Sequence, residues 1–123
     1  MINKTVARNF DLEERTAKFA EAVIDLTRKL SQEAVNVRLI EQAVGSAGSL
    51  GANYCEANEA ESKRDFQHKI SICKKEIKEC RYWLRLLARA NPNYKEELPV
   101  LWRESQELLL IFSKILKSSK SKV

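Results

Sequence analysis

Residues 62–92 read SKRDFQHKISICKKEIKECRYWLRLLARANP, and this stretch decides the fold. Ser62 followed by Asp65 has the spacing of a capping box, which marks the start of a helix. Pro92 disfavours helical geometry at Asn91, so the helix is expected to end there. Between these signals apolar side chains recur every three or four residues, the period of a helix with one buried face: Phe66, Ile70, Cys73, Ile77, Cys80, Leu84 and Leu87. The pattern predicts a helix from about Lys63 to Ala90.

The net charge of the protein is concentrated in the same helix. The whole chain of 123 residues has 22 Lys plus Arg and 17 Asp plus Glu, a surplus of +5. Residues 61–89 alone hold 9 basic and 4 acidic residues, which is also a surplus of +5. At about 100° per residue, six of these cations fall within about 80° of arc that no acidic residue interrupts. We call them the basic stripe: Lys63, Lys74, Lys78, Arg81, Arg85 and Arg89.

The basic stripe has three possible interpretations. Its spacing matches a phosphate backbone, the interpretation we favour, and the alternative is an acidic protein surface such as that of a polymerase. It could also be a solvated helix face that takes part in salt bridges between subunits. Tyr82 lies beside the stripe and Trp83 lies well away from it, and both are interpreted as packing residues. Any binding of nucleic acid is therefore expected to be directed at the backbone and weakly sequence-specific.

Periodicity predicts three further helices. The first runs from about Leu12 to Leu30 behind a capping box at Asp11 and Glu14, and the second runs from about residue 36 to 59. In the last helix, Pro99 either lies in the first turn or kinks a longer helix. Only 3 Gly and 2 Pro are present, which disfavours an all-β fold with its many turns. Short connections make neighbouring helices antiparallel, so we expect an all-α, up-and-down four-helix bundle. It should form one domain over residues 1–123, with residues 1–10 and 118–123 flexible.

The second predicted helix contains every glycine of the protein, Gly45, Gly48 and Gly51, within a stretch of residues 42–55 that has no charge. Glycine costs about 1 kcal/mol relative to alanine inside a helix, so three of them need a reason. Small residues four apart would let another helix approach closely. A loop that breaks the helix at Gly45–Gly51 is the alternative. The absence of charge indicates burial on more than one side, either at the centre of the bundle or against another subunit.

No catalytic or metal-binding constellation is recognisable. The only histidine is His68, whereas a di-metal carboxylate site in a bundle needs two Glu-x-x-His-type pairs. Cys55, Cys73 and Cys80 contain no CxxC pair and are expected to be buried apolar side chains. We therefore expect no enzyme activity, no metal and no cofactor.

Three glutamates are interpreted as partners in salt bridges. Glu56, Glu76 and Glu79 are expected to form salt bridges with Lys75 or Arg81.

No signal-peptide run is found at the N-terminus, and no segment approaches the ~20 apolar residues of a membrane span. The sequence therefore predicts a cytoplasmic protein without a membrane partner.

The segment from Ser46 to Leu87 resembles the bacterial ribosomal RNA intervening-sequence protein family, and residues 11–20 resemble the first helix of that family. The resemblance covers most of residues 11–116. It rests on these matching elements: Ser49, Ala52-Asn53, Glu56, Ser62, Asp65-Phe66, Lys75-Glu76, Glu79 and Tyr82-Trp83-Leu84.

The resemblance implies a four-helix bundle that assembles into a ring, commonly a homopentamer. It also implies similarity to the accessory variability proteins of diversity-generating retroelements, which are basic and bind a reverse transcriptase and nucleic acid. It implies no enzymatic activity. A ring needs two different faces on each subunit. The candidates for these faces are the small residues of the second helix and surplus apolar residues of the last: Gly45, Gly48, Ser49, Ala52, Trp102, Leu110 and Ile111.

Overall fold

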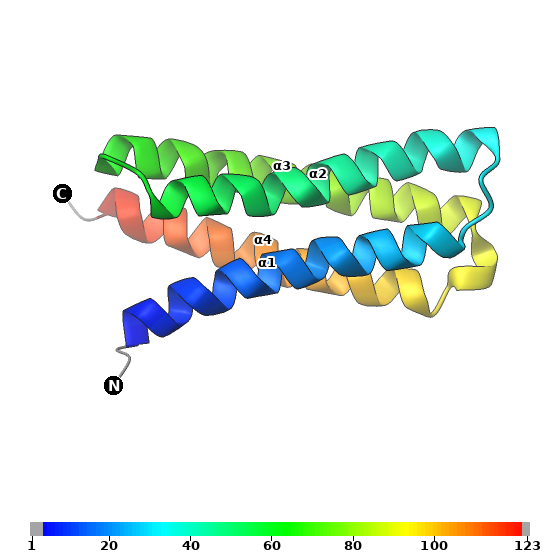
Figure 1. Ribbon diagram of the computed structural model, residues 1–123, viewed down its shortest axis with the longest axis horizontal. Coiled ribbons are helices and arrows are strands. Elements are labelled where there is room, and N and C mark those ends of the chain that lie inside the picture. Colours follow the sequence, from blue (N-terminus) through cyan, green and yellow to red (C-terminus); the bar gives the residue numbers. More distant parts are fainter. Residues whose placement is uncertain (1–3, 122–123) are drawn as a thin grey trace.

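The computed structural model of the protein is an antiparallel arrangement of helices, and it describes residues 4–121, with side chains from residue 12 onward (Figure 1). The helices are α1 (Lys4–Lys29), α2 (Ala34–Asn58), α3 (Lys63–Ala90) and α4 (Glu97–Ser121), with a 3-10 turn η1 (Pro92–Tyr94) before α4. Successive helices run in opposite directions, so both ends of the described chain lie at the same end of the bundle (Figure 1). The predicted all-α, up-and-down four-helix bundle is confirmed.

Helix α3 is the centre of the packing, since it contacts both α2 and α4 extensively, whereas α1 and α4 make the sparsest contact of any two neighbouring helices. It begins where predicted, because the Ser62 hydroxyl accepts a hydrogen bond from the backbone N–H of Asp65 at 3.0 Å. Asn91 leaves helical geometry before Pro92. Phe66, at the start of the apolar face, is only half-buried. The other predicted core residues are at most 1% exposed: Ile70, Cys73, Ile77, Cys80, Leu84 and Leu87.

The seam between α2 and α3 is closed by small side chains. Ala43 and Ala47 of α2 are fully buried. The thiol of Cys80 donates to the carbonyl of Ala43 at 3.7 Å, and the thiol of Cys73 donates to that of Leu50 at 3.6 Å. Burial raises the pKa of Cys73 to about 12 and that of Cys80 to about 11, so both thiols are neutral packing groups.

Helix α2 continues without a break through its three glycines, which excludes a loop at that point. Its first turn is capped by the carboxylate of Glu33, which accepts from the backbone N–H of Asn36 at 3.2 Å. Gly51 faces α1, where a Cβ would lie 3.4 Å from the Thr16 hydroxyl, an ordinary van der Waals contact. Cys55 is exposed, so the expectation that all three cysteines are buried is wrong for this one.

The predicted start of α1 is wrong. The helix begins at Lys4, so Asp11 lies inside it and does not cap it. A capping box is a local signal, and no glycine or proline between Lys4 and Asp11 interrupts the helix. Residues 4–10, which were expected to be flexible, are part of this helix, and residues 1–3 lie outside the described part. At the other end α4 includes residues 118–121, while residues 122–123 lie outside the described part.

Two buried asparagines lock one end of the bundle. Asn36 and Asn91 are 1% and 9% exposed, and their side-chain amides exchange two hydrogen bonds, of 2.8 and 2.9 Å. The amide of Asn36 also donates to the Ser31 carbonyl, and that of Asn91 donates to the Leu87 carbonyl. The pair thereby ties the connection between α1 and α2 to the C-terminus of α3. Because both amides are satisfied, the cost of burying them is offset.

Helix α4 resolves the open question about Pro99, which lies in the first turn and does not kink a longer helix. Leu101, Leu108 and Phe112, on the apolar face of this helix, are buried. The other three residues of that face are half-buried at the edge of the core: Leu109, Ile115 and Leu116.

Candidate nucleic-acid interface

The basic stripe lies along the flank of α3 that faces α4. The guanidinium carbon of Arg81 sits 4.8 Å from the ring centre of Trp102 on α4, and the amide of Gln67 donates to the Ser119 hydroxyl at 3.1 Å. These contacts set the register of the two antiparallel helices along the stripe. Lys74 and Arg81 are half-buried against α4, whereas the outer cations are exposed: Lys63, Lys78, Arg85 and Arg89.

Within residues 12–121, none of the six stripe cations forms an ion pair with a carboxylate of the chain. No ion pair within residues 12–121 joins Glu56, Glu76 or Glu79 to Lys75 or Arg81, so that expectation is wrong. Glu56 pairs with Lys69 at 3.2 Å, and Glu76 accepts a hydrogen bond from Ser49. The cause is geometric, because Arg81 points to α4 while Glu76 meets a side chain of α2.

The absence of acids makes the stripe unfavourable for the isolated helix. Lys74 and Lys78 are four residues apart, as are Arg81 and Arg85, and Arg85 and Arg89. Like charges at this spacing destabilise a helix by about 0.2–0.5 kcal/mol per pair. A row of cations kept at this cost is well suited to an external partner that carries negative charge.

Helix α4 adds two cations to this surface that the sequence pattern did not indicate. By sequence alone, Lys117 and Lys120 fall in a Ser/Lys-rich tail that is expected to fray. In the structure they line, together with Lys74 of α3, a shallow groove of about 470 Å³. The rest of its lining is Ser113, Leu116 and Ser121. Their spacing of three residues on one helix is visible in the sequence, but only the packing of α3 against α4 brings them to Lys74.

Arg81 has a second role that its neighbours in the stripe lack. Its guanidinium stacks over Trp102, and its Nε atom is buried without a hydrogen-bond partner. The side-chain oxygen Oε1 of Gln106, one turn after Trp102 on α4, is likewise buried and unpaired. Arg81 is thus a packing residue of the α3–α4 seam as well as a cation, so substitutions that test binding should spare it.

The residues predicted to form subunit interfaces lie on two separate surfaces, because α2 packs against α1 and α3 while α4 packs mainly against α3. On α2, Gly45, Gly48 and Ala52 are exposed, and a Cβ at either glycine would meet nothing within 4 Å. Ser49 is half-buried and its hydroxyl accepts from the Asn53 amide at 3.1 Å. On α4, Leu110 is 61% exposed. The other two, Trp102 and Ile111, are partly buried against the core.

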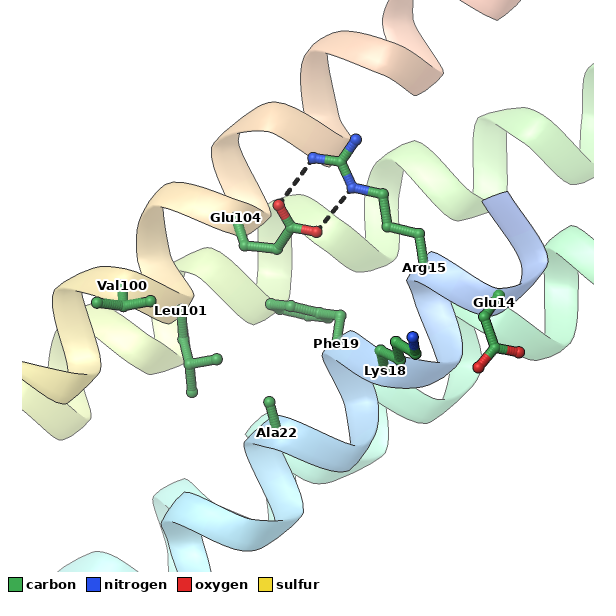
Figure 2. Close-up of a pocket in the computed structure, with 8 residues that line it drawn as sticks. All are labelled: Glu14, Arg15, Lys18, Phe19, Ala22, Val100, Leu101 and Glu104. Atoms are coloured by element: carbon green, nitrogen blue, oxygen red, sulfur yellow. Dashed lines mark hydrogen bonds and ion pairs between the residues drawn. The ribbon is translucent and has the colours of Figure 1, made fainter. Parts of the chain in front are cut away.

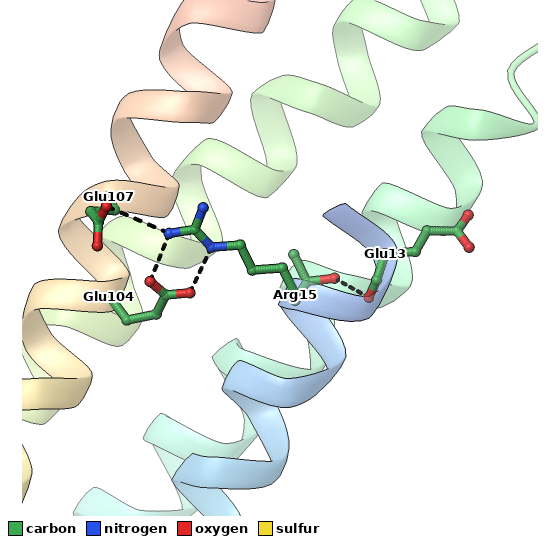
Figure 3. A network of polar contacts seen from close by, with 5 residues as sticks. Glu13, Arg15, Glu104 and Glu107 are labelled. Atoms are coloured by element: carbon green, nitrogen blue, oxygen red, sulfur yellow. Dashed lines mark hydrogen bonds and ion pairs between the residues drawn. The ribbon is translucent and has the colours of Figure 1, made fainter. Parts of the chain in front are cut away.

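A second groove, of about 460 Å³, lies between α1 and α4, the neighbouring helices with the sparsest contact (Figure 2). Phe19, Ala22 and Leu101 contribute apolar lining. Across the groove Arg15 donates two hydrogen bonds of 2.8 Å to the carboxylate of Glu104. Glu107 lies 3.7 Å from the same guanidinium (Figure 3). The cation here is already held by carboxylates of the chain, unlike those of the basic stripe.

The chemistry of the remaining titratable groups is plain. His68 is exposed, and no group of three His, Cys, Asp or Glu residues within the described chain is placed to hold a metal ion. The pKa of Glu76 is raised by burial, with the neighbouring Glu79 adding to the shift and the Ser49 hydrogen bond opposing it. No helix among residues 4–121 combines the length and apolar character that crossing a membrane requires.

The fold and this surface define a class of protein: a small antiparallel four-helix bundle with a row of unpaired cations along one helix. Within that class the chain belongs to the 23S rRNA-intervening sequence protein family, whose sequence model matches residues 8–116. The resemblance noted in the sequence is thereby confirmed.

A solved structure with the same fold supports this assignment. It is the crystal structure of a protein of unknown function from the S23 ribosomal protein family of Bacteroides thetaiotaomicron. It is 30% identical, superposes with a TM-score of 0.77, and covers 85% of this chain and 97% of its own. A search of curated proteins found no match.

Proposed function

We propose that this protein is a non-catalytic, oligomeric, cytoplasmic bundle that binds nucleic acid through the basic stripe of α3. The observation that carries the proposal is the row of six cations with no ion pair to a carboxylate of the described chain. Lys117 and Lys120 widen this positive surface onto α4. Contacts of this kind neutralise phosphates and release counterions, so affinity should fall steeply with salt and depend little on sequence.

The test is binding of generic RNA and DNA, measured by fluorescence anisotropy across a salt series. The variant replaces Lys78, Arg85 and Arg89 with Glu, since these three cations are exposed and make no packing contact like that of Arg81. A matched control replaces three exposed cations of α1 and α2 with Glu: Lys18, Arg28 and Arg38. Both variants change the net charge equally, so only the position of the charge differs.

We expect the stripe variant to lose affinity by at least about 100-fold at low salt, because reversing three charges removes three phosphate contacts and adds repulsion. The control should retain most of the affinity. Absence of wild-type binding at low salt would contradict the proposal. Equal losses in the two variants would also contradict it, because they would show a response to net charge alone.

The same stripe also fits an acidic protein surface, which makes an interaction scaffold for a partner such as a polymerase the second candidate. Co-purification from the native host separates the two. Recovery of nucleic acid without an acidic protein would count against the scaffold.

The proposal includes a ring-shaped homo-oligomer, with a pentamer favoured by the family resemblance. Its support is that packing within the chain does not explain Gly45 or Gly48, where a Cβ would meet open space. Leu110, 61% exposed, offers an apolar residue on the other surface. Docking of one surface onto the other between copies would close a ring.

Light scattering tests this assembly. The wild type should have several times the subunit mass of 14.2 kDa, and Gly48→Glu or Leu110→Glu should reduce it. Val35→Glu, at a residue of α2 that is 54% exposed and outside the proposed interface, is the control. A wild-type particle of 14.2 kDa at micromolar concentration would contradict the ring.

A further inference from the structure

Tyr82 is the aromatic residue that the fold does not explain. It was expected to be a packing residue, but its side chain is 54% exposed. Its hydroxyl forms no hydrogen bond to any residue of the described chain. Its ring meets Trp83 edge to face, with centroids 5.2 Å apart and an angle of 70° between the planes. Trp83 in turn is partly buried against the core, so Tyr82 is braced on one side and open to solvent on the other.

Two of the four residues next to Tyr82 on the helix surface are cations of the basic stripe, and the other two are Glu79 and Leu86. Residues three and four apart are adjacent on a helix, which places Lys78 and Arg85 beside the ring and Arg89 one turn further along. All three are exposed. The acidic neighbour Glu79 lies on the side of the ring away from the stripe. Tyr82 therefore forms the outer edge of the positive surface.

An exposed tyrosine next to unpaired cations has the chemistry of a stacking platform. Proteins that bind single strands combine a positive surface along the backbone with aromatic rings on which bases stack. A duplex presents its phosphates but keeps its bases paired and stacked inside. Tyrosine is also a weaker helix former than alanine, lysine or glutamate, so helix propensity does not account for its presence at this exposed site.

We propose that Tyr82 stacks on an unpaired base, so that the basic stripe takes single-stranded RNA or DNA in preference to duplex. This inference rests on the proposed function and names the class of nucleic acid that it involves. Lys78 and Arg85 hold the phosphates on either side of the stacked nucleotide. Because every base has a flat face, the stacking adds affinity without adding strong sequence preference.

The experiment compares oligo-U, oligo-dT and a duplex of the same length as ligands. The proteins are wild type, Tyr82→Ala, Tyr82→Phe, and Val35→Ala as a control at a residue of α2 that is also 54% exposed. We expect Tyr82→Ala to lose about five-fold or more of its affinity for both single strands. Its affinity for the duplex should stay within about two-fold, since only the phosphates are contacted there. Tyr82→Phe should retain single-strand binding, because it keeps the ring.

The outcomes separate this inference from the proposed function. If the wild type binds single strands and Tyr82→Ala binds them equally well, the stacking is overturned while the proposed function stands. Equal losses on single strands and duplex also overturn it, because a structural defect would act on both. If the wild type binds none of the three ligands, the proposed function itself has failed. Preference for oligo-U over oligo-dT, or the reverse, assigns the natural ligand to RNA or DNA within the same inference.

Discussion

The two flanks of α3 carry charge in opposite ways. On the side of α2, Lys69 pairs with Glu56 at 3.2 Å, and Glu76 accepts from Ser49. Fully buried alanines of α2 close the seam beside them. On the side of α4, six cations stand in a row and none of them pairs with a carboxylate of the described chain. Both flanks pack in the fold, and the difference between them is the basis of our proposal that the second flank also contacts an anionic partner.

The strongest expected effect is a loss of folding stability, and it concerns the flank of α3 that faces α2. Ala47→Leu forces extra volume into the closed seam between α2 and α3, where Ala47 is fully buried. We expect the free energy of unfolding in urea to fall by about 1–3 kcal/mol. Lys78→Leu, at an exposed residue of the stripe, should change it by less than about 0.5 kcal/mol. Equal costs at the two sites would remove the distinction between the flanks.

A second substitution asks how far the binding surface extends across α4. Lys117→Ala combined with Lys120→Ala removes two cations that line the groove beside Lys74. Affinity for nucleic acid should fall by about an order of magnitude at moderate salt, with little change in stability. Lys69→Ala, on the opposite flank, is the single-cation control and should leave affinity within about two-fold. An unchanged affinity in the double variant would confine the surface to α3.

The smallest expected effect concerns the pH dependence of stability. The folded-state pKa of Glu76 is raised, chiefly by burial, so folding favours its protonated form. Its contribution is therefore favourable at low pH and is lost as the pH rises through the raised pKa. Glu76→Gln should melt at a slightly higher temperature than the wild type at pH 7, and this difference should shrink in acid. A variant that melts lower at pH 7 would show that the ionised carboxylate stabilises the fold.

Part of the fold was predictable from the sequence, because its signals lie in residues that are close together along the chain. The apolar periodicity and the capping signals of α3 involve only residues close together in the sequence, so its bounds at Lys63 and Ala90 could be predicted. The start of α1 did not follow, because an Asp–Glu pair with capping-box spacing also occurs inside a helix.

The parts of the candidate site that were missed depend on packing between helices. Lys117 and Lys120 join the stripe only through the register of α4 against α3. Arg81 acquires its stacking role only because Trp102 comes opposite it. The exposure of Tyr82 depends on where α3 meets its neighbours, which its angle on an isolated helix leaves open.

The central claim is that the cations of α3 neutralise phosphates, and the salt dependence of binding tests it most directly. The logarithm of the binding constant should fall linearly with the logarithm of the salt concentration for the wild type. Replacing Lys78, Arg85 and Arg89 with Ala should reduce that slope by about two to three units, close to one for each phosphate that is no longer neutralised. A slope that is the same in the variant and the wild type would contradict the account, because it would place the phosphates elsewhere on the protein.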